Sequence, residues 1–339
     1  MTKALTSRIE WIDTAKGIGL ICVILGHLGV PYLSTWIYTF HMPLFFFLSG
    51  AVFSGEKYSF TEYVKRKLKS LVLPYFTLGG GIFLFFSIVY AVQGQPLSAY
   101  VQMLKDFLTQ EHYWTVWFLA CLFLVEVIYY GLYALCGKHP LVATALSLLL
   151  CVFGLLRYHL GWGSLPWNLD VALVAQFFFH CGYLLKGQYH RLSGIGQMNL
   201  LKKGIIALGL LALNAIPGFL CIRVSGESLD MSIGMYGNEI LTFLSAFAGI
   251  FLIIFLSHTL HHKCLTWLGR NTMIIFAWHS RIIIVLCGFI YEYLGVFQSS
   301  QSFISQLIYA VVTAAVIFGL LVPATHLIKR SKWHALFGV

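Results

Sequence analysis

Long apolar segments separated by short polar ones dominate the chain. Ten of these segments are long enough to form membrane-spanning helices, which need about 20 apolar residues each. They cover 12–31, 36–53, 71–92, 114–136, 141–160, 168–186, 201–221, 238–260, 271–290 and 303–328. The polar segments between them are too short to hold a soluble domain. The pattern predicts an all-α integral membrane protein, with a single transmembrane domain of about ten helices over residues 1–339.

Lysine and arginine residues are distributed asymmetrically over the polar segments. If the N-terminus is cytoplasmic, eighteen of the 22 basic residues fall on the cytoplasmic side, whereas Lys105, Arg157 and Arg223 fall outside and Arg281 lies within a span. Basic residues are retained on the cytoplasmic side of membrane proteins. The asymmetry alternates consistently with ten spans and predicts that both termini are cytoplasmic.

The composition excludes several other classes of protein. Of the 339 residues, 59% are hydrophobic and only 10% are charged, whereas about 25% are charged in soluble globular proteins. The net charge of +10 is explained by the cytoplasmic segments, so no nucleic-acid partner is expected. The eight cysteines show no C-x-x-C spacing, and we expect no metal site.

The first span carries three polar residues on one helical face. Lys16 and His27 are eleven positions apart and lie within about 20° of each other at 100° per residue. Asp13 lies on the same face, but it is about 20 Å from His27 along the axis. Asp13 therefore cannot orient the imidazole of His27, and any carboxylate that does so must come from another segment.

Further polar residues lie near the middle of other spans. The second span contains His41 followed by Pro43, which favours a kink there. Glu126 is the one carboxylate near mid-membrane, and the ninth span contains His279 and Arg281. Arg281 either pairs with Glu126 or holds helices together. Gln176 and His180 lie at a similar depth. Because ionisable groups are costly in a membrane, they indicate a polar cavity with acid–base capability, although polar residues also join helices.

A basic segment precedes the third span. It contains Lys65, Arg66, Lys67 and Lys69. Two interpretations are open: the segment either anchors the protein on anionic lipid or binds a phosphorylated cytosolic ligand.

Several motifs together resemble the membrane-bound acyltransferase type 3 family, on the branch similar to fucose 4-O-acetyltransferases. The most specific are Trp-Ile-Asp-Thr-Ala-Lys-Gly at 11–17 with Gly-His at 26–27, and Phe-His-Met-Pro-Leu-Phe-Phe-Phe-Leu-Ser-Gly at 40–50. Weaker matches are the basic segment 65–75, Trp-Phe-Leu at 117–119 with Glu126, and Trp-Leu-Gly-Arg-Asn-Thr at 267–272 with His279.

The resemblance implies transfer of an acyl group, usually acetyl, from cytosolic acetyl-CoA to a sugar, glycolipid or polysaccharide hydroxyl outside the cytoplasm. It implies a multi-pass protein of a bacterial-type inner membrane, with acetyl-CoA as a substrate and no tightly bound cofactor. The essential histidine of the family corresponds to His27, and its acidic and basic residues to Asp13 and Lys16. The family's R-x-x-R pair aligns with Lys67 and Ser70, which leaves open which cation contacts CoA.

We therefore predict that His27 acts as general base or takes the acyl group transiently. Glu126 or His41 is predicted to orient His27 or to stabilise its charged form. The predicted donor-binding residues are Asp13, Lys16, Lys65, Arg66, Lys67, Lys69 and Arg270. The predicted acceptor-binding residues are Tyr113, Trp114, Trp117 and His279. The three aromatic residues among them also fit the aromatic belt of a membrane interface.

Two other functions remain open from the sequence. Intramembrane histidine, glutamate and arginine also suit the proton relay of a secondary transporter or glycan exporter, although the internal repeats common in transporters are absent. A sensor or assembly subunit without chemistry is the second alternative.

Overall fold

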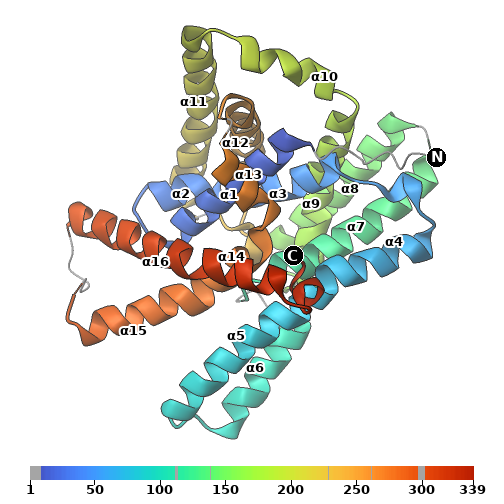
Figure 1. The fold of residues 1–339 in the computed structure, drawn as a ribbon. Helices are drawn as coiled ribbons and strands as arrows, with labels where there is room; N and C mark the ends of the chain where they lie inside the picture. The colour runs from blue at the N-terminus through green and yellow to red at the C-terminus, as the bar shows by residue number, and fades with distance from the viewer. Residues whose placement is uncertain (1–8, 111–113, 138, 228, 261, 297–301) are drawn as a thin grey trace.

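The computed structural model describes residues 9–110, 114–137, 139–227, 229–260, 262–296 and 302–339. Every secondary-structure element named within these ranges is a helix. Nine segments of this part of the chain are long and apolar enough to cross a membrane. The predicted all-α, multi-pass membrane bundle is therefore confirmed (Figure 1).

Six predicted spans each form one long helix. These are α7 (Trp117–Cys136), α8 (Pro140–His159), α9 (Leu169–Lys186), α11 (Leu200–Ser225), α12 (Glu239–Thr259) and α16 (Phe303–Arg330). Two short helices, α10 (Tyr189–Leu192) and α13 (Lys263–Arg270), lie between them in the chain. Long apolar runs were a sufficient signal for these spans.

Three predicted spans are interrupted or extended. The second consists of α2 (Leu33–Tyr38) and α3 (His41–Ala51). The third is the end of a longer helix, in which α4 (Phe60–Lys67), a π-helical turn (Leu68–Val72) and α5 (Leu73–Val92) follow without a break. The ninth comprises α14 (Thr272–Trp278), a π-helical segment (His279–Ile284) and α15 (Val285–Tyr293).

The break between α2 and α3 agrees with the predicted kink near His41. The backbone leaves the helical conformation at Phe40, with φ of −141°. Pro43 then lies in the first turn of α3, where the backbone N–H groups have no helical acceptor and proline is tolerated. The imidazole of His41 thus lies at a helix start inside the bundle.

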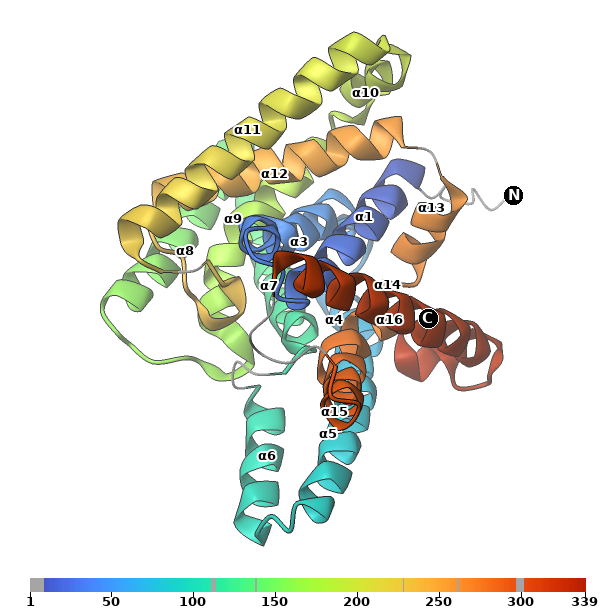
Figure 2. The same ribbon diagram turned by 90° about the vertical axis from the view of Figure 1, so that its left-hand side faces the viewer.

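The first predicted span forms α1 (Glu10–His27) at the centre of the bundle (Figure 2). Its 18 residues include three charged ones, so it is more polar than the nine long apolar helices. It packs on α2, α3, α12, α13 and α14, and most of its side chains are buried. α1 is therefore surrounded by protein, which allows it to carry polar groups.

Glycines allow α1 and α13 to approach closely. A Cβ atom on Gly269 would lie 1.7 Å from the carbonyl oxygen of Asp13, and one on Gly17 would lie 2.1 Å from that of Leu265. α3 and α9 cross in the same way at Gly50, where a Cβ would lie 1.9 Å from a carbonyl oxygen of α9. These contacts leave no space for a methyl group, and they fix α1 relative to its neighbours.

Helix α6 (Leu97–Thr109) was not predicted. It runs back along α5, and the ring of Phe107 stacks on Tyr75 with centroids 5.4 Å apart. Figure 1 shows the α5–α6 pair projecting from the rest of the bundle. With 13 residues, α6 is too short to produce the signal of a full span.

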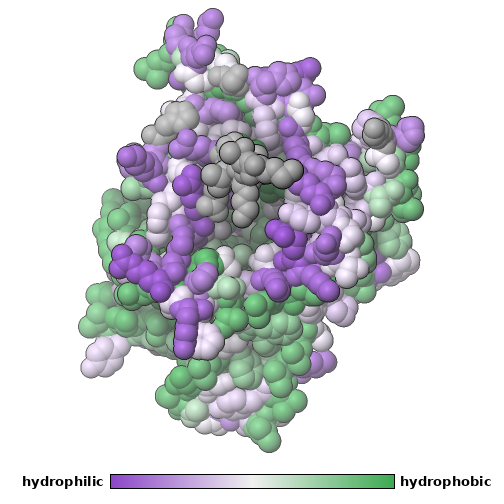
Figure 3. All heavy atoms as spheres, turned by 45° about the vertical axis from the view of Figure 1, so that its right-hand side comes forward, coloured by the Kyte–Doolittle hydropathy of each residue, from purple (hydrophilic) through white to green (hydrophobic). Residues whose placement is uncertain are grey.

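Hydrophilic residues gather on one face of the molecule, and hydrophobic residues cover the projecting helices (Figure 3). We call one end of the bundle the basic side; it carries the start of α1, helix α4 and the C-terminal ends of α13 and α16. Lys329 of α16 donates to Asn271 over 2.7 Å. The C-terminal turn reaches between α5 and α14, where Gly338 lies beside Pro74 and Met273.

Candidate active site

His27 is the last residue of α1, and one hydrogen bond fixes its tautomer. Its Nδ1 lies 2.9 Å from the carbonyl oxygen of Val23. A carbonyl oxygen only accepts, so Nδ1 carries the proton and Nε2 of the neutral ring keeps a lone pair. His27 thus presents a proton acceptor at the end of α1 opposite to the basic side.

Two further histidines are held in the same way. Nδ1 of His41 donates to the carbonyl oxygen of Ile37 over 3.0 Å, and Nδ1 of His279 donates to that of Phe276 over 2.7 Å. The ring of His279 meets that of His27 edge-on, with centroids 4.9 Å apart. His279 begins the π-helical segment, and such segments are frequent at functional sites.

A cavity of about 380 Å³ lies against His27. It is lined by His27, Tyr38, His41, Trp114, Asp230 and Arg281 among others. The ring of Tyr38 contacts both imidazoles, with its centroid 5.9 Å from that of His27 and 4.8 Å from that of His41. The volume falls within the range of small-molecule sites, and the lining combines a base, an acid, a fixed positive charge and aromatic rings.

Asp230 is the functional candidate that sequence reasoning missed. It lies in a tight turn, where its backbone N–H donates to Met235 over 3.0 Å. Its Oδ1 accepts two hydrogen bonds from Ser232, one from the backbone N–H over 2.8 Å and one from the side-chain hydroxyl over 2.6 Å. Asp230 lines the cavity together with His27. Asp230 is therefore a carboxylate from another segment that lies at the same cavity as His27.

The prediction that Glu126 orients His27 is wrong. Its Oε1 lies 2.6 Å from Nζ of Lys67, and its other oxygen accepts from the hydroxyl of Tyr63. Both partners belong to α4, which continues the helix of α5 into the bundle and brings Lys67 to mid-height of α7. Arg281, proposed as an alternative partner of Glu126, lines the cavity with His27 instead.

The same contact gives Lys67, one of the predicted donor-binding residues, a partner within the protein. Its ammonium is neutralised by a carboxylate whose side chain is only 4% exposed. The neighbouring cations Lys65, Arg66 and Lys69 are exposed, and the guanidinium of Arg66 lies 4.3 Å from the ring centroid of Tyr58. These three remain the candidates for phosphate contact on α4 and the π-helical turn.

The structure brings together two other predicted donor residues, Asp13 and Arg270. Oδ2 of Asp13 accepts from Nε of Arg270 over 2.7 Å. The side chain of Arg270 is 39% exposed, and Asp13 fixes its orientation on the basic side. Lys16, the third predicted donor residue in this region, lies on α1 with Asp13 and is half-buried.

The predicted acceptor residues divide into three groups. Trp114 and Trp117 line the cavity, and at 8% and 6% exposure they are too buried for an aromatic belt at a lipid interface. His279 is fully buried and touches the ring of His27. Tyr113 lies outside the described residues.

Comparison with known proteins identifies the class. An acyltransferase domain family matches residues 9–322, which is most of the chain. The chain therefore belongs to this acyltransferase family, and the predicted family and enzyme class are confirmed at that level.

A curated relative is nodulation protein NolL of Mesorhizobium japonicum. It is 31% identical over 125 residues, which cover 31% of this chain and 31% of the relative. The chain thus aligns with only about a third of that relative. No solved structure is significantly similar to the chain.

Proposed function

We propose that the protein transfers an acetyl group from cytosolic acetyl-CoA to a hydroxyl of a cell-surface or lipid-linked sugar, in the inner membrane of a bacterial-type cell. The observation that carries the proposal is the free Nε2 of His27 at a cavity that also holds Asp230 and Arg281. Family membership supports acyl transfer as the reaction class.

The reaction is direct transfer with general-base catalysis. Nε2 of His27 takes the proton from the sugar hydroxyl while the oxygen of this hydroxyl attacks the thioester carbonyl. The C–S bond of the tetrahedral intermediate then breaks. The thiolate leaves with the proton from the imidazolium, so that the products are the acetyl ester and free CoA.

Two charged residues of the cavity have complementary roles in this reaction. The carboxylate of Asp230 stabilises the imidazolium that forms on His27. Arg281 remains positively charged at any physiological pH and stabilises the oxygen of the tetrahedral intermediate. The edge of His279 limits the rotation of the His27 ring, with centroids 4.9 Å apart, and thereby keeps Nε2 directed at the cavity.

The donor reaches the cavity from the basic side in this proposal. Lys65, Arg66 and Lys69 together with Arg270 attract the phosphates of CoA, and Asp13 holds the guanidinium of Arg270. The gathering of hydrophilic residues on one face supports such an approach (Figure 3).

A substitution of His27 tests the proposal. Surface glycans of cells that express the wild-type chain, a His27→Gln variant or no chain are compared by mass spectrometry, together with acetyl transfer from labelled acetyl-CoA by the purified protein in lipid nanodiscs. Loss of a general base lowers the rate by about 10²–10⁴-fold, so we expect the wild type to add acetyl units and the variant to add almost none.

His180→Gln is the matched control. His180 is also a buried intramembrane histidine, but it is bonded to Tyr129 over 2.9 Å and to Thr144 over 2.8 Å. We expect this variant to keep its activity within a few fold. Unchanged acetylation by His27→Gln, or wild-type protein that transfers no acetyl group from acetyl-CoA, would refute the proposed function.

A further inference from the structure

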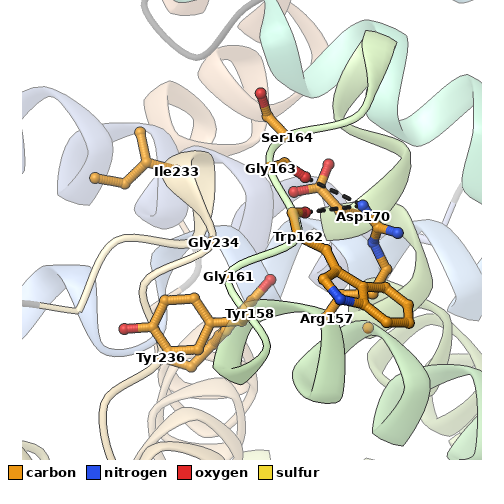
Figure 4. A pocket seen from close by; sticks show the side chains of 11 residues that line it. Arg157, Tyr158, Gly161, Trp162, Gly163, Ser164, Asp170, Ile233, Gly234 and Tyr236 are labelled. Carbon is orange, nitrogen blue, oxygen red and sulfur yellow. Dashed lines mark hydrogen bonds between the residues drawn. The ribbon is translucent and has the colours of Figure 1, made fainter.

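A second cavity, of about 220 Å³, adjoins the first. It lies between the C-terminal end of α8, the loop before α9 and the turn that carries Asp230, and Ile233 lines both cavities. Arg157, Trp162, Asp170 and Tyr236 contribute side chains to it (Figure 4). The proposed reaction in the first cavity does not use any of these four residues.

The side chains of Arg157 and Trp162 pack against each other at the second cavity. The guanidinium of Arg157 donates to the carbonyl oxygens of Trp162 over 2.9 Å and Gly163 over 3.1 Å, and it lies 5.5 Å from the ring centroid of Trp162 (Figure 4). The loop that carries the tryptophan is thereby tied to α8. Trp162 is nevertheless 51% exposed, so much of its indole surface is available to a ligand.

Tyr236 offers a hydroxyl without a partner. The residue is 5% exposed, and its hydroxyl has no hydrogen-bond partner in the described part of the chain. Burial raises the pKa of Tyr236, so the hydroxyl stays protonated and can donate. A buried polar group without a partner is costly, and a ligand hydroxyl would relieve this cost.

The charges of the cavity decide the class of ligand. Arg157 and Asp170 contribute opposite charges, so the cavity has no excess of positive charge for a phosphate. The cavity is also lined by four glycines, which have no side chains to narrow its opening: Gly154, Gly161, Gly163 and Gly234. A saturated ring with many hydroxyl groups fits this setting. Its hydroxyls can pair with the guanidinium, the carboxylate and the tyrosine, and its C–H face can pack on the indole.

We propose that the second cavity binds a further sugar unit of the acceptor, so that the enzyme acts on an oligosaccharide chain rather than on a single sugar. This inference rests on the proposed function. The acceptor chain runs from His27 past Ile233 to Trp162, and the second cavity determines its affinity and orientation.

Acceptors of different length test the inference. Surface glycan of the same cells without the chain, which therefore lacks its modification, is partly hydrolysed and sorted by size. Acetyl transfer from acetyl-CoA to the monosaccharide and tetrasaccharide fractions is then measured with purified protein in nanodiscs. For the wild type, we expect kcat/KM to be about tenfold higher for the tetrasaccharides, as for one well-packed aromatic contact. Trp162→Ala should remove this advantage and leave transfer to monosaccharides unchanged.

Trp333→Ala is the matched control, since Trp333 is 56% exposed and also has a cation, Lys332, 5.1 Å from its ring centroid. We expect it to keep the preference for tetrasaccharides. A wild type without length preference, or a Trp162→Ala variant that loses both acceptors equally or neither, would overturn the second site while acyl transfer itself stands. A wild type that acetylates neither fraction would instead refute the proposed function and, with it, the inference.

Discussion

The contact between Glu126 and Lys67 allows a quantitative test of how this bundle tolerates charge. The pair joins α7 to α4 at 2.6 Å, with side-chain exposures of 4% and 22%. Removal of one partner of a buried pair typically costs about 3–5 kcal/mol. Because the ammonium of Lys67 can reach water, we expect Glu126→Gln to lower the free energy of unfolding by about 3 kcal/mol, the lower end of that range.

The double substitution Glu126→Gln with Lys67→Met separates structural from catalytic roles. The cost of breaking a buried pair comes mainly from the charge that is left without a partner. The double variant leaves no such charge, so its stability should recover to within about 1 kcal/mol of the wild type. Thermal and denaturant unfolding in nanodiscs would measure both variants, and acetyl transfer would be assayed in parallel. We expect the folded double variant to keep wild-type kcat, since neither residue lines the cavity at His27.

The ion pair between Lys186 and Glu56 serves as the control. Its side chains are 32% and 28% exposed, and such pairs contribute about 0–1 kcal/mol, so Glu56→Gln should have little effect on stability. Additive effects of the two substitutions at Glu126 and Lys67 would refute the structural role. A stable double variant with a large loss of kcat would assign Glu126 to catalysis.

Two further predictions concern the cavity and the central helix. Asp230→Asn should lower kcat about tenfold at saturating donor, because an amide no longer stabilises the charged imidazole of His27; an unchanged kcat would exclude this role. Gly269→Ala should destabilise the protein by about 1–3 kcal/mol or more in unfolding experiments, since its Cβ would lie 1.7 Å from the backbone oxygen of Asp13. Gly204→Ala, with no atom within 4 Å of the added Cβ, should be neutral, and equal stability of both glycine variants would contradict the close crossing of α1 and α13.

The spans were predictable because lipid imposes a length on apolar helices. Runs such as 201–221 and 238–260 correspond to α11 and α12 with small shifts at the ends. The interruptions were less visible. Apolar character is the same in α-helical and π-helical turns, so hydropathy gave no sign of the π-helical segment His279–Ile284. The extension by α4 was hidden because that helix is polar on most of its surface.

The site was predictable where a polar residue interrupts an apolar span. His27, His41 and His279 were found in this way, and the structure brings their rings to one region. The same signal also marks residues that join helices. Gln176, for example, donates to the backbone of Val125 over 3.0 Å, and His180 bridges Tyr129 and Thr144. Depth along a helix does not show which neighbour the side chain faces.

Glu126 and Asp230 show this limit in opposite directions. Glu126 lies at the depth in the membrane expected of a catalytic carboxylate, but in the folded protein it forms an ion pair with Lys67. Asp230 lies in a turn without helical or strand periodicity, and only the fold places it at the cavity. Charge in a loop indicates topology, whereas its proximity to a histidine from another segment depends on packing between helices that are distant in sequence.

In the proposed reaction, helix α1 connects the binding site of a cytosolic donor with that of an acceptor on the other side of the membrane. Asp13 and His27 are fourteen positions apart on the same helix, which separates Arg270 from the imidazole by about 20 Å along the axis. The long, flexible arm of CoA suits this separation, with its phosphates at one end and its thioester at the other. In the proposed reaction the nucleotide therefore stays on the basic side, and only the acetyl group crosses to the sugar. The close packing of α1 on α13 at Gly17 and Gly269 holds Arg270 at a fixed distance from His27.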